Sequence, residues 1–487
     1  MTDEKMPEVA PDSGETAGAA PTDGDTVEFP PRMSDADSVM WSIEKDPMLR
    51  STILTLAVFD RPIDRARFVH TIDRATRVIP RLRQRVRSNP LSLAPPRWEV
   101  DPHFDLDYHL RFARPAGNGT MRELLQFAEP IAMQGFDRAR PLWEMTVVDG
   151  LEEERSAVLM KIHHSITDGV GGMKLQLELF DLEPDAPEKP LPAPPPVHVM
   201  DQRERFIDAM THETRRYLGM LKRNARNVIP ATIDAAAHPR RSAESVLDTL
   251  GSMRRLMAPV TAPLSPIMER RSLSVHFDTL TVPLRDAKNA AKAVGGKLND
   301  AFVGGVVLGL HKYHELHGAE CCEVHMSMPI NIRNDDSANV AGNSFVPTRF
   351  TVPISFSGAA ETVRAIHERV RSVREEPALD LVDPMANVIT RLPTTILTQV
   401  FGSMMKGMDL TTSNVPGAPF AVYLSGARLE AQYAFGPLAG AAMNITLLSY
   451  IDELNIGINL DPVAVPDADA LLKCFAEGFE EVLALAR

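Results

Sequence analysis

Residues 156–172 have the sequence SAVLMKIHHSITDGVGG, and the rest of the chain is best understood outward from this stretch. It begins as a short apolar run, which predicts a buried strand, and it turns through glycines into a helical segment near Met173. Two adjacent histidines end the strand, and an aspartate follows in the strand-to-helix turn. Because consecutive strand residues point to opposite faces, only one of His163 and His164 can face a given cavity.

The residue types in this stretch suit proton transfer. A neutral imidazole has an unperturbed pKa of about 6.5, so it can accept a proton near neutral pH. A well-placed general base contributes about 100- to 10,000-fold to a reaction rate. A lone histidine in a core is usually structural, but an adjacent pair followed by Asp168 and Gly169 is a more specific pattern, and Gly169 allows the tight turn.

Residues 163–169 match HHxxxDG, the signature of CoA-dependent acyltransferases, a superfamily that includes chloramphenicol acetyltransferase and peptide-synthetase condensation domains. Further stretches resemble the bacterial wax ester synthase/diacylglycerol acyltransferase family in particular. They are PLW at 141–143, ND at 299–300, TTSNVPGA at 411–418, and Asn444 with Ser449-Tyr450. The chain departs from the family pattern at Ala418, where proline is usual, and at Gly304-Gly305 within a long apolar helix.

The resemblance implies an α/β fold of two chloramphenicol-acetyltransferase-like sandwich halves with a tunnel between them. It also implies acyl transfer from acyl-CoA to diacylglycerol or a long-chain alcohol, without a metal, another cofactor or a covalent acyl-enzyme. His164 would be the general base and His163 would support it. In the superfamily the motif aspartate commonly pairs with an arginine, and we expect Arg333 to pair with Asp168, since an unpaired buried charge is costly.

The remaining candidate residues follow from the same motifs. Gly169, Asn299 and Asp300 are expected to support the site, with Asn299 and Asp300 where helix N-caps belong. Trp143, Ser413, Asn414 and Asn444 are expected to line the substrate tunnel, with 411–418 forming a loop after a strand. For Trp143 the alternative is simple packing in the core.

Composition and charge divide the chain into four regions. Residues 1–32 are expected to form a disordered acidic tail, 33–182 the first half with HHxxxDG, 183–272 a proline-rich crossover with basic amphipathic helices, and 273–487 the second half. The net charge of −13 argues against nucleic-acid binding. Three cysteines fit a reducing cytoplasm, and neither a signal peptide nor an apolar run of about 18 residues is expected to direct the chain elsewhere.

Three functions stay open from the sequence. The first is the O-acyltransferase, the second a free-standing condensation-type enzyme with a carrier-bound donor, and the third a non-catalytic lipid-droplet or membrane-binding protein. The basic helical segment 203–228 fits either a solvated charged face or docking on an anionic membrane or lipid droplet. The histidines between His311 and His325 lack HExxH spacing, so no metal site is predicted, and serine-hydrolase and nucleotide-binding motifs are absent.

Overall fold

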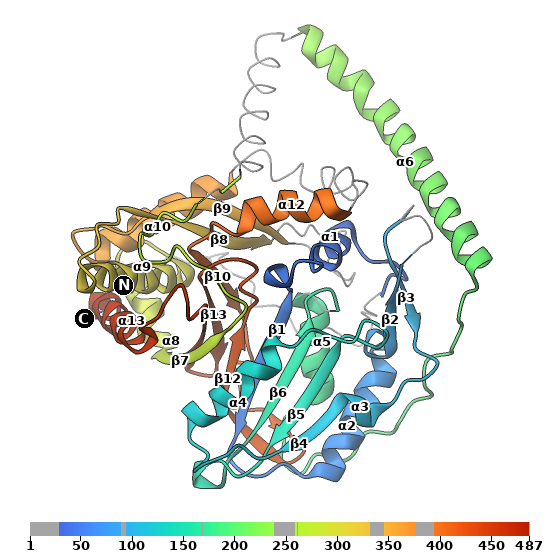
Figure 1. Cartoon of the computed structure of the whole chain (residues 1–487), viewed down its shortest axis with the longest axis horizontal. Coiled ribbons are helices and arrows are strands. Elements are labelled where there is room, and N and C mark those ends of the chain that lie inside the picture. Colours follow the sequence, from blue (N-terminus) through green and yellow to red (C-terminus); the bar gives the residue numbers. More distant parts are fainter. Residues whose placement is uncertain are drawn as a thin grey trace, which may run out of the picture.

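The computed structural model describes residues 29–88, 94–166, 169–237, 259–260, 262–331, 345–375 and 394–486. Within these residues the chain forms two six-stranded sheets with helices packed on them (Figure 1). The predicted α/β fold is therefore confirmed. The predictions for Asp168, Arg333 and tail residues 1–28 fall on residues outside the described ranges. For residues 29–32 the prediction of a disordered tail is wrong, because the backbone N–H of Trp98 donates to the carbonyl of Pro31 at 2.9 Å and holds this segment against β3 (Arg97–Val100).

The first sheet has the strand order β11-β12-β1-β6-β5-β4. Its strands are β1 (Thr52–Phe59), β4 (Leu110–Ala113), β5 (Trp143–Val148), β6 (Ser156–His163), β11 (Tyr423–Leu424) and β12 (Ala427–Phe435). One face packs against α2 (Arg65–Val78) and α5 (Gly169–Leu179), and the other against α4 (Met121–Met133). Strands β5 and β6 form an antiparallel hairpin.

The second sheet has the order β7-β14-β13-β10-β8-β9. Its strands are β7 (His276–Pro283), β8 (Glu323–Asn331), β9 (Phe345–Pro353), β10 (Leu410–Val415), β13 (Met443–Tyr450) and β14 (Glu453–Leu460). Its main core lies beneath α9 (Leu298–Leu316), α10 (Ala359–Arg374) and α13 (Ala468–Leu483), while α8 (Leu284–Ala293) packs beside them. This sheet is thus apolar on the side that carries the helices.

The two halves exchange structure across the sequence-based division at residue 273. Strand β12 comes from the C-terminal region but pairs antiparallel with β1, from Leu54 opposite Phe435 to Phe59 opposite Leu429. Strand β11 extends the same sheet beyond β12. The alternation of apolar residues along a strand reports which face is buried but not which distant strand supplies the hydrogen bonds, so the sequence could not assign β12 to the first half.

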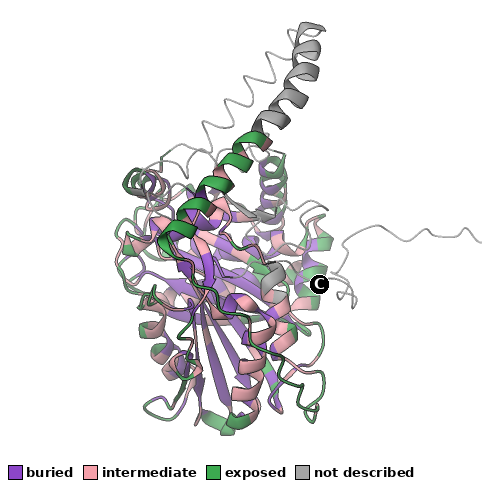
Figure 2. Cartoon of the chain, turned by 90° about the vertical axis from the view of Figure 1, so that its right-hand side faces the viewer, coloured by how far each residue is buried: buried purple, intermediate pink, exposed green. Residues whose placement is uncertain are grey.

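A further contact between the halves is made by α1 (Asp35–Ile43), and one long helix lies on the outside of the molecule. Helix α1 of the first half packs on α12 (Thr394–Met405) of the second through a small cluster that includes Ile43 and Leu397. Helix α6 (Gln202–Ala237) follows the extended crossover and runs along the outside of the molecule (Figures 1 and 2). The remaining described elements are the ribbon of β2 (Gln84–Arg87) and β3 (Arg97–Val100), α3 (Leu106–His109), and 3₁₀ turns at Pro47–Leu49, Pro80–Arg83, Glu152–Glu154 and Ala484–Ala486.

The glycines inside α9 have a packing role. A Cβ atom on Gly305 would lie 2.5 Å from the ring of Phe479, and one on Gly309 would lie 2.4 Å from the ring of Phe475. Both phenylalanines are on α13, so the glycines let these two core helices approach closely.

Over the part of the chain that is described, no single helix is long and apolar enough to cross a membrane. The pair of α8 and α9, bent by 93°, would be long and apolar enough by length and composition only.

Candidate active site

The histidine pair lies where β6 ends beside the start of β1. His163 is the last residue of β6 and sits opposite Thr52, and His164 begins the turn that follows. The backbone N–H of His164 donates to the carbonyl of Ser51 at 2.9 Å, which holds the turn against the first strand. The side chain of His163 is 1% exposed, whereas that of His164 is only partly buried. The two neighbours therefore lie in different surroundings, as predicted.

Both ring nitrogens of His163 are engaged. Its Nε2 lies 2.9 Å from Oε1 of Glu44, and its Nδ1 lies 2.7 Å from Oγ of Ser165. The backbone N–H of Ser165 also donates to Nδ1, at 3.1 Å. A nitrogen that accepts from a backbone N–H carries no proton, so the hydrogen-bond network places the proton of neutral His163 on Nε2, where it is donated to Glu44.

The surroundings of His163 are largely apolar. The rings of Trp41 and Phe136 approach the imidazole edge-to-face, with centroid separations of 5.8 and 6.2 Å. Burial acts to raise the pKa of Glu44, but the hydrogen bonds from His163 and the Ser51 N–H and the nearby charge of Arg138 outweigh it. The net pKa of Glu44 is lower than usual, so this carboxylate is ionised at neutral pH.

Residues 411–415 form strand β10, which corrects the prediction of a loop over 411–418. This strand pairs in parallel with β13, with Thr411 opposite Asn444 and Ser413 opposite Thr446. Only 416–418 follow as a connection without regular structure. The ladder with β13 supplies hydrogen bonds that a local sequence pattern does not reveal, and it turns a polar, proline-bounded segment into a strand.

The register of β10 separates two predicted tunnel residues. Partners in a sheet share a face, so Ser413 lies on the same face as Asn444, which is the face turned toward β12 and the first half. Asn414 lies opposite Leu447, a residue of the core beneath the helices, and its side chain is exposed at the strand end. Ser413 and Asn444 are thus brought together, and Asn414 is not.

Asn444 is buried and fixes the loop that follows β12. Its Nδ2 donates to the carbonyl of Pro437 at 2.9 Å, and its Oδ1 accepts from the hydroxyl of Thr446 at 3.0 Å. From the next strand, Nδ2 of Asn459 donates to the carbonyl of Gly436 at 2.9 Å. These amides tie the second sheet to the end of the strand that belongs to the first.

A recess at this junction is lined by both halves. From the first sheet and its surroundings it includes Arg50, Thr52, Leu54, Met133 and Phe435 of β12, and from the rest of the second half Phe277, Leu438 and Asn459. Thr52 is the strand partner of His163, so the recess lies close to the turn that follows β6 at His164. Three residues near this site lie outside every motif quoted above, and no spacing in the sequence indicates them: Glu44, Arg50 and Asn459.

Trp143 is placed in the core of the first half. Its side chain is 1% exposed, its indole N–H donates to the carbonyl of Leu82 at 2.7 Å, and its ring stacks on His109 with centroids 4.5 Å apart. Trp143 lies opposite Ile162 of β6, within the cluster packed by α2 and α5. This position favours the core alternative for Trp143 over the tunnel.

Asn299 and Asp300 lie inside the first turn of α9, one and two residues after its first residue, so the expectation that they are N-caps is wrong. Lys297 occupies the N-cap position. The carboxylate of Asp300 nevertheless serves the helix start, since it accepts from the backbone N–H of Lys297 at 2.8 Å and lies 2.7 Å from Nδ1 of His367 on α10. Asn299 contacts the sulfur of Met328. Their role here is to join elements of the second half.

The histidines near the C-terminal end of α9 make ordinary hydrogen bonds within the fold. His314 is buried, with Nε2 2.8 Å from Oγ of Ser265 and Nδ1 2.7 Å from the carbonyl of Leu310. Among the residues that the structure describes, no group of three or more histidine, cysteine, aspartate or glutamate side chains is arranged to hold a metal ion.

Comparison with known proteins settles the family. Residues 33–302 match the model of the wax ester synthase/diacylglycerol acyltransferase catalytic domain, and residues 341–482 match that of the C-terminal domain of the same proteins. The chain belongs to the wax ester synthase/diacylglycerol acyltransferase family. The family resemblance and the enzyme class predicted from the sequence, an acyltransferase, are confirmed.

Relatives of this wax ester synthase/diacylglycerol acyltransferase family member align along most of its length. A Mycobacterium tuberculosis (strain ATCC 25618 / H37Rv) protein named as a diacylglycerol O-acyltransferase is 34% identical over 460 residues, covering 94% of this chain and 93% of the relative. Another protein of that strain with the same name is 29% identical over 425 residues, covering 84% and 87%. These alignments extend through both halves.

Solved structures support the fold. The wax ester synthase/diacylglycerol acyltransferase from Marinobacter aquaeolei VT8 superposes with a TM-score of 0.60 at 21% identity, covering 93% of this chain and 99% of that one. The first condensation domain of the calcium-dependent antibiotic synthetase superposes with a TM-score of 0.58 at 15% identity, covering 93% and 96%. The predicted two-half architecture of chloramphenicol acetyltransferase type is thus confirmed.

Proposed function

We propose that this protein transfers a long-chain acyl group from acyl-CoA to the hydroxyl of diacylglycerol or of a long-chain alcohol, with His164 as the general base. The observation that carries the assignment is the engagement of His163. With Glu44 on Nε2 and Ser165 on Nδ1, His163 has no ring nitrogen left to take a proton from a substrate. The base chemistry of the motif therefore falls to His164.

In this scheme the imidazole of His164 takes the proton of the acceptor hydroxyl as its oxygen attacks the thioester carbonyl carbon. The tetrahedral intermediate then collapses, the carbon–sulfur bond breaks, and the imidazolium returns the proton to the departing CoA thiolate. The products are the ester and free CoA. The negative oxygen of the intermediate needs a donor, and the hydroxyl of Ser413 is the candidate because it lies on the face of the second sheet turned toward the first half.

The experiment is release of free thiol from palmitoyl-CoA, with diacylglycerol or hexadecanol as acceptor. His164→Ala should lower the acceptor-dependent rate by about 100- to 10,000-fold, the usual contribution of a general base. His103→Ala removes an exposed histidine of the same half and should leave the rate unchanged. Unchanged turnover in His164→Ala would refute the assignment, and no release by the wild-type protein with either acceptor would shift the proposal to a carrier-bound donor or a non-catalytic lipid-binding protein.

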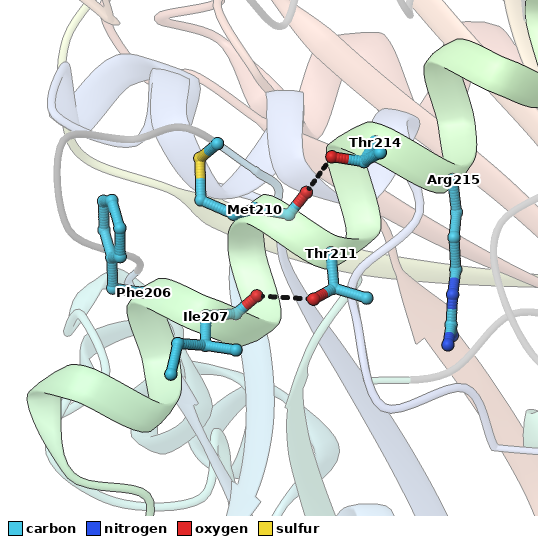
Figure 3. A pocket seen from close by; sticks show the side chains of 6 residues that line it. All are labelled: Phe206, Ile207, Met210, Thr211, Thr214 and Arg215. Atoms are coloured by element: carbon cyan, nitrogen blue, oxygen red, sulfur yellow. Dashed lines mark hydrogen bonds between the residues drawn. The ribbon is translucent and has the colours of Figure 1, made fainter.

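We further propose that the protein is a cytoplasmic enzyme that docks on an anionic membrane or lipid-droplet surface through α6. The inner face of α6 is anchored, because Asp208 bonds both Arg32 and Arg97 and Arg216 lies 2.8 Å from Asp35. Opposite to this face, five large apolar side chains are 42–59% exposed. They are Phe206, Ile207, Met210, Tyr217 and Leu218; Figure 3 shows the first three with Arg215.

The charge of α6 favours an anionic partner. Residues 202–237 contain seven lysines and arginines and four aspartates and glutamates, a net charge of +3 in a chain whose net charge is −13. An exposed apolar stripe flanked by arginines such as Arg203 and Arg215 is the pattern of helices that lie in a membrane interface.

Co-sedimentation with vesicles of phosphatidylglycerol and of phosphatidylcholine tests this docking. The wild-type protein should bind the anionic vesicles more strongly, and Ile207→Asp with Met210→Asp should abolish most of the binding. Leu316→Asp, which changes a still more exposed leucine at the end of α9, is the control. Equal binding by the wild type and the α6 variant would refute docking through this helix.

A further inference from the structure

The carboxylate of Glu44 is hydrogen-bonded to His163 directly and is linked to His164 through the backbone of Ser51. Glu44 caps the C-terminal end of α1, and its side chain is 10% exposed. Its Oε1 accepts from the backbone N–H of Ser51 at 2.7 Å and lies 2.9 Å from Nε2 of His163. The carbonyl of the same Ser51 accepts from the backbone N–H of His164 at 2.9 Å. One oxygen thus ties the start of β1 to the end of β6.

We infer that Glu44 is a positioning residue for acyl transfer, which acts by fixing the tautomer of His163 and the place of His164. The inference rests on the function proposed above. If His163 carried its proton on Nδ1, the Ser165 N–H would meet another N–H, and the lone pair of Nε2 would face the carboxylate of Glu44. Glu44 and Ser165 therefore select the same tautomer from opposite sides of the ring.

The carboxylate is itself held in place. Nη2 of Arg138 donates to Oε2 of Glu44 at 3.4 Å and to the carbonyl of Trp41 at 3.1 Å. The guanidinium also lies over the ring of Trp41, 4.0 Å from its centroid, and that ring in turn packs on His163. Arg138 donates to Oε2 of Glu44, so the other oxygen, Oε1, accepts from Ser51 and His163.

The position of Glu44 also places it at the contact between the halves. Helix α1 packs through Ile43, the residue directly before Glu44, on Leu397 of α12. A side chain at the end of this helix is therefore supported by packing from the second half as well as the first. Loss of its hydrogen bonds should displace the histidine turn without removing any group that touches substrate.

Kinetics of five variants, among them the single variant His163→Ala, test the inference. Glu44→Ala should lower kcat by about 100-fold with little change in KM, because a displacement of about 1 Å in a reacting group can cost that much. Glu44→Gln keeps an acceptor oxygen and should lose about tenfold or less. The double variant Glu44→Ala/His163→Ala should be no worse than the poorer single variant, since residues that act as one unit are not additive. Glu481→Gln, at a surface ion pair with Lys312, is the control.

Additive losses in the double variant, or a normal kcat in Glu44→Ala, would overturn the inference. Should Glu44→Ala not fold, Glu44→Asp decides the same question, because it keeps the charge but withdraws the oxygen from Nε2; a kcat equal to wild type would overturn the inference.

A second measurement does not depend on activity. In ¹⁵N-histidine-labelled protein, His163 should give a slowly exchanging, downfield Nε2–H signal that is lost in His163→Ala and in Glu44→Ala and kept in Glu44→Gln. Persistence of the signal in Glu44→Ala would overturn the inference. If the signal behaves as expected while the wild-type protein transfers no acyl group, the proposed function fails and the pairing of Glu44 with His163 stands.

Discussion

Ser413 lies directly opposite Thr446 in the parallel pair of β10 and β13, so its hydroxyl shares a face with Asn444, whereas Asn414 points to the other side. If Ser413 donates to the oxyanion, Ser413→Ala should lower kcat by about 100- to 1,000-fold, the cost of removing one such donor. Asn414→Ala should stay close to wild type. Steady-state thiol release on both variants checks this, and a loss in Asn414→Ala equal to that in Ser413→Ala would contradict the register argument.

Trp143→Phe should affect stability but not substrate choice. The variant keeps an aromatic ring in the core but leaves the buried carbonyl of Leu82 without its indole partner, which costs about 1–3 kcal/mol. Urea unfolding measures this loss. Rates with acyl-CoA donors of different chain length, measured well below the unfolding temperature, should keep the wild-type order. A changed chain-length preference would indicate that Trp143 lines the substrate tunnel.

His109 should make the protein less stable in acid. Its ring is fully buried between Trp143 and Phe104, and burial lowers its pKa to about 4 from 6.5. The unfolded chain then binds the proton more readily than the folded chain. The contribution of His109 to the free energy of unfolding is therefore complete above about pH 6.5 and is lost as the pH falls toward 4. The difference between the folded and unfolded pKa of His109 corresponds to about 3 kcal/mol in the free energy of unfolding.

Urea unfolding at several pH values checks the role of His109. His109→Asn keeps a donor for the carbonyl of Trp143 but cannot titrate, so its stability should fall less steeply between pH 6.5 and 4. The exposed His103 provides the matched control, His103→Asn, which should retain the wild-type slope. Identical slopes in wild type and His109→Asn would show that another group is responsible.

Gly305→Ala should destabilise the second half although alanine is the better helix former. The new methyl group would lie 2.5 Å from the ring of Phe479, and the resulting overlap should outweigh the gain in helix propensity and leave a net loss of about 1–2 kcal/mol. Phe479→Leu makes room, so Gly305→Ala should cost less in that background. Thermal unfolding of the four proteins of this cycle gives the coupling, and an equal cost in both backgrounds would argue against direct contact.

Most of the secondary structure could be predicted from the sequence because its signals are local. Helix α4 and the hairpins of β5 with β6 and of β13 with β14 form where helical spacing, apolar runs and turns occur in the sequence. The HHxxxDG motif indicated the acyltransferase superfamily for the same reason, since its residue types and spacing lie within seven positions, and the family itself was indicated by further short motifs such as those at 141–143 and 411–418. Periodicity and capping act between near neighbours in the chain.

The tertiary structure decided what depends on distant partners. It assigned β12 to the first sheet, made 411–415 a strand through pairing with β13, and placed Trp143 in the core. It also brought Glu44 to His163, a residue 119 positions away. Strand pairing and the burial of a polar side chain depend on hydrogen-bond and packing partners that only folding brings together, and a local pattern does not identify them.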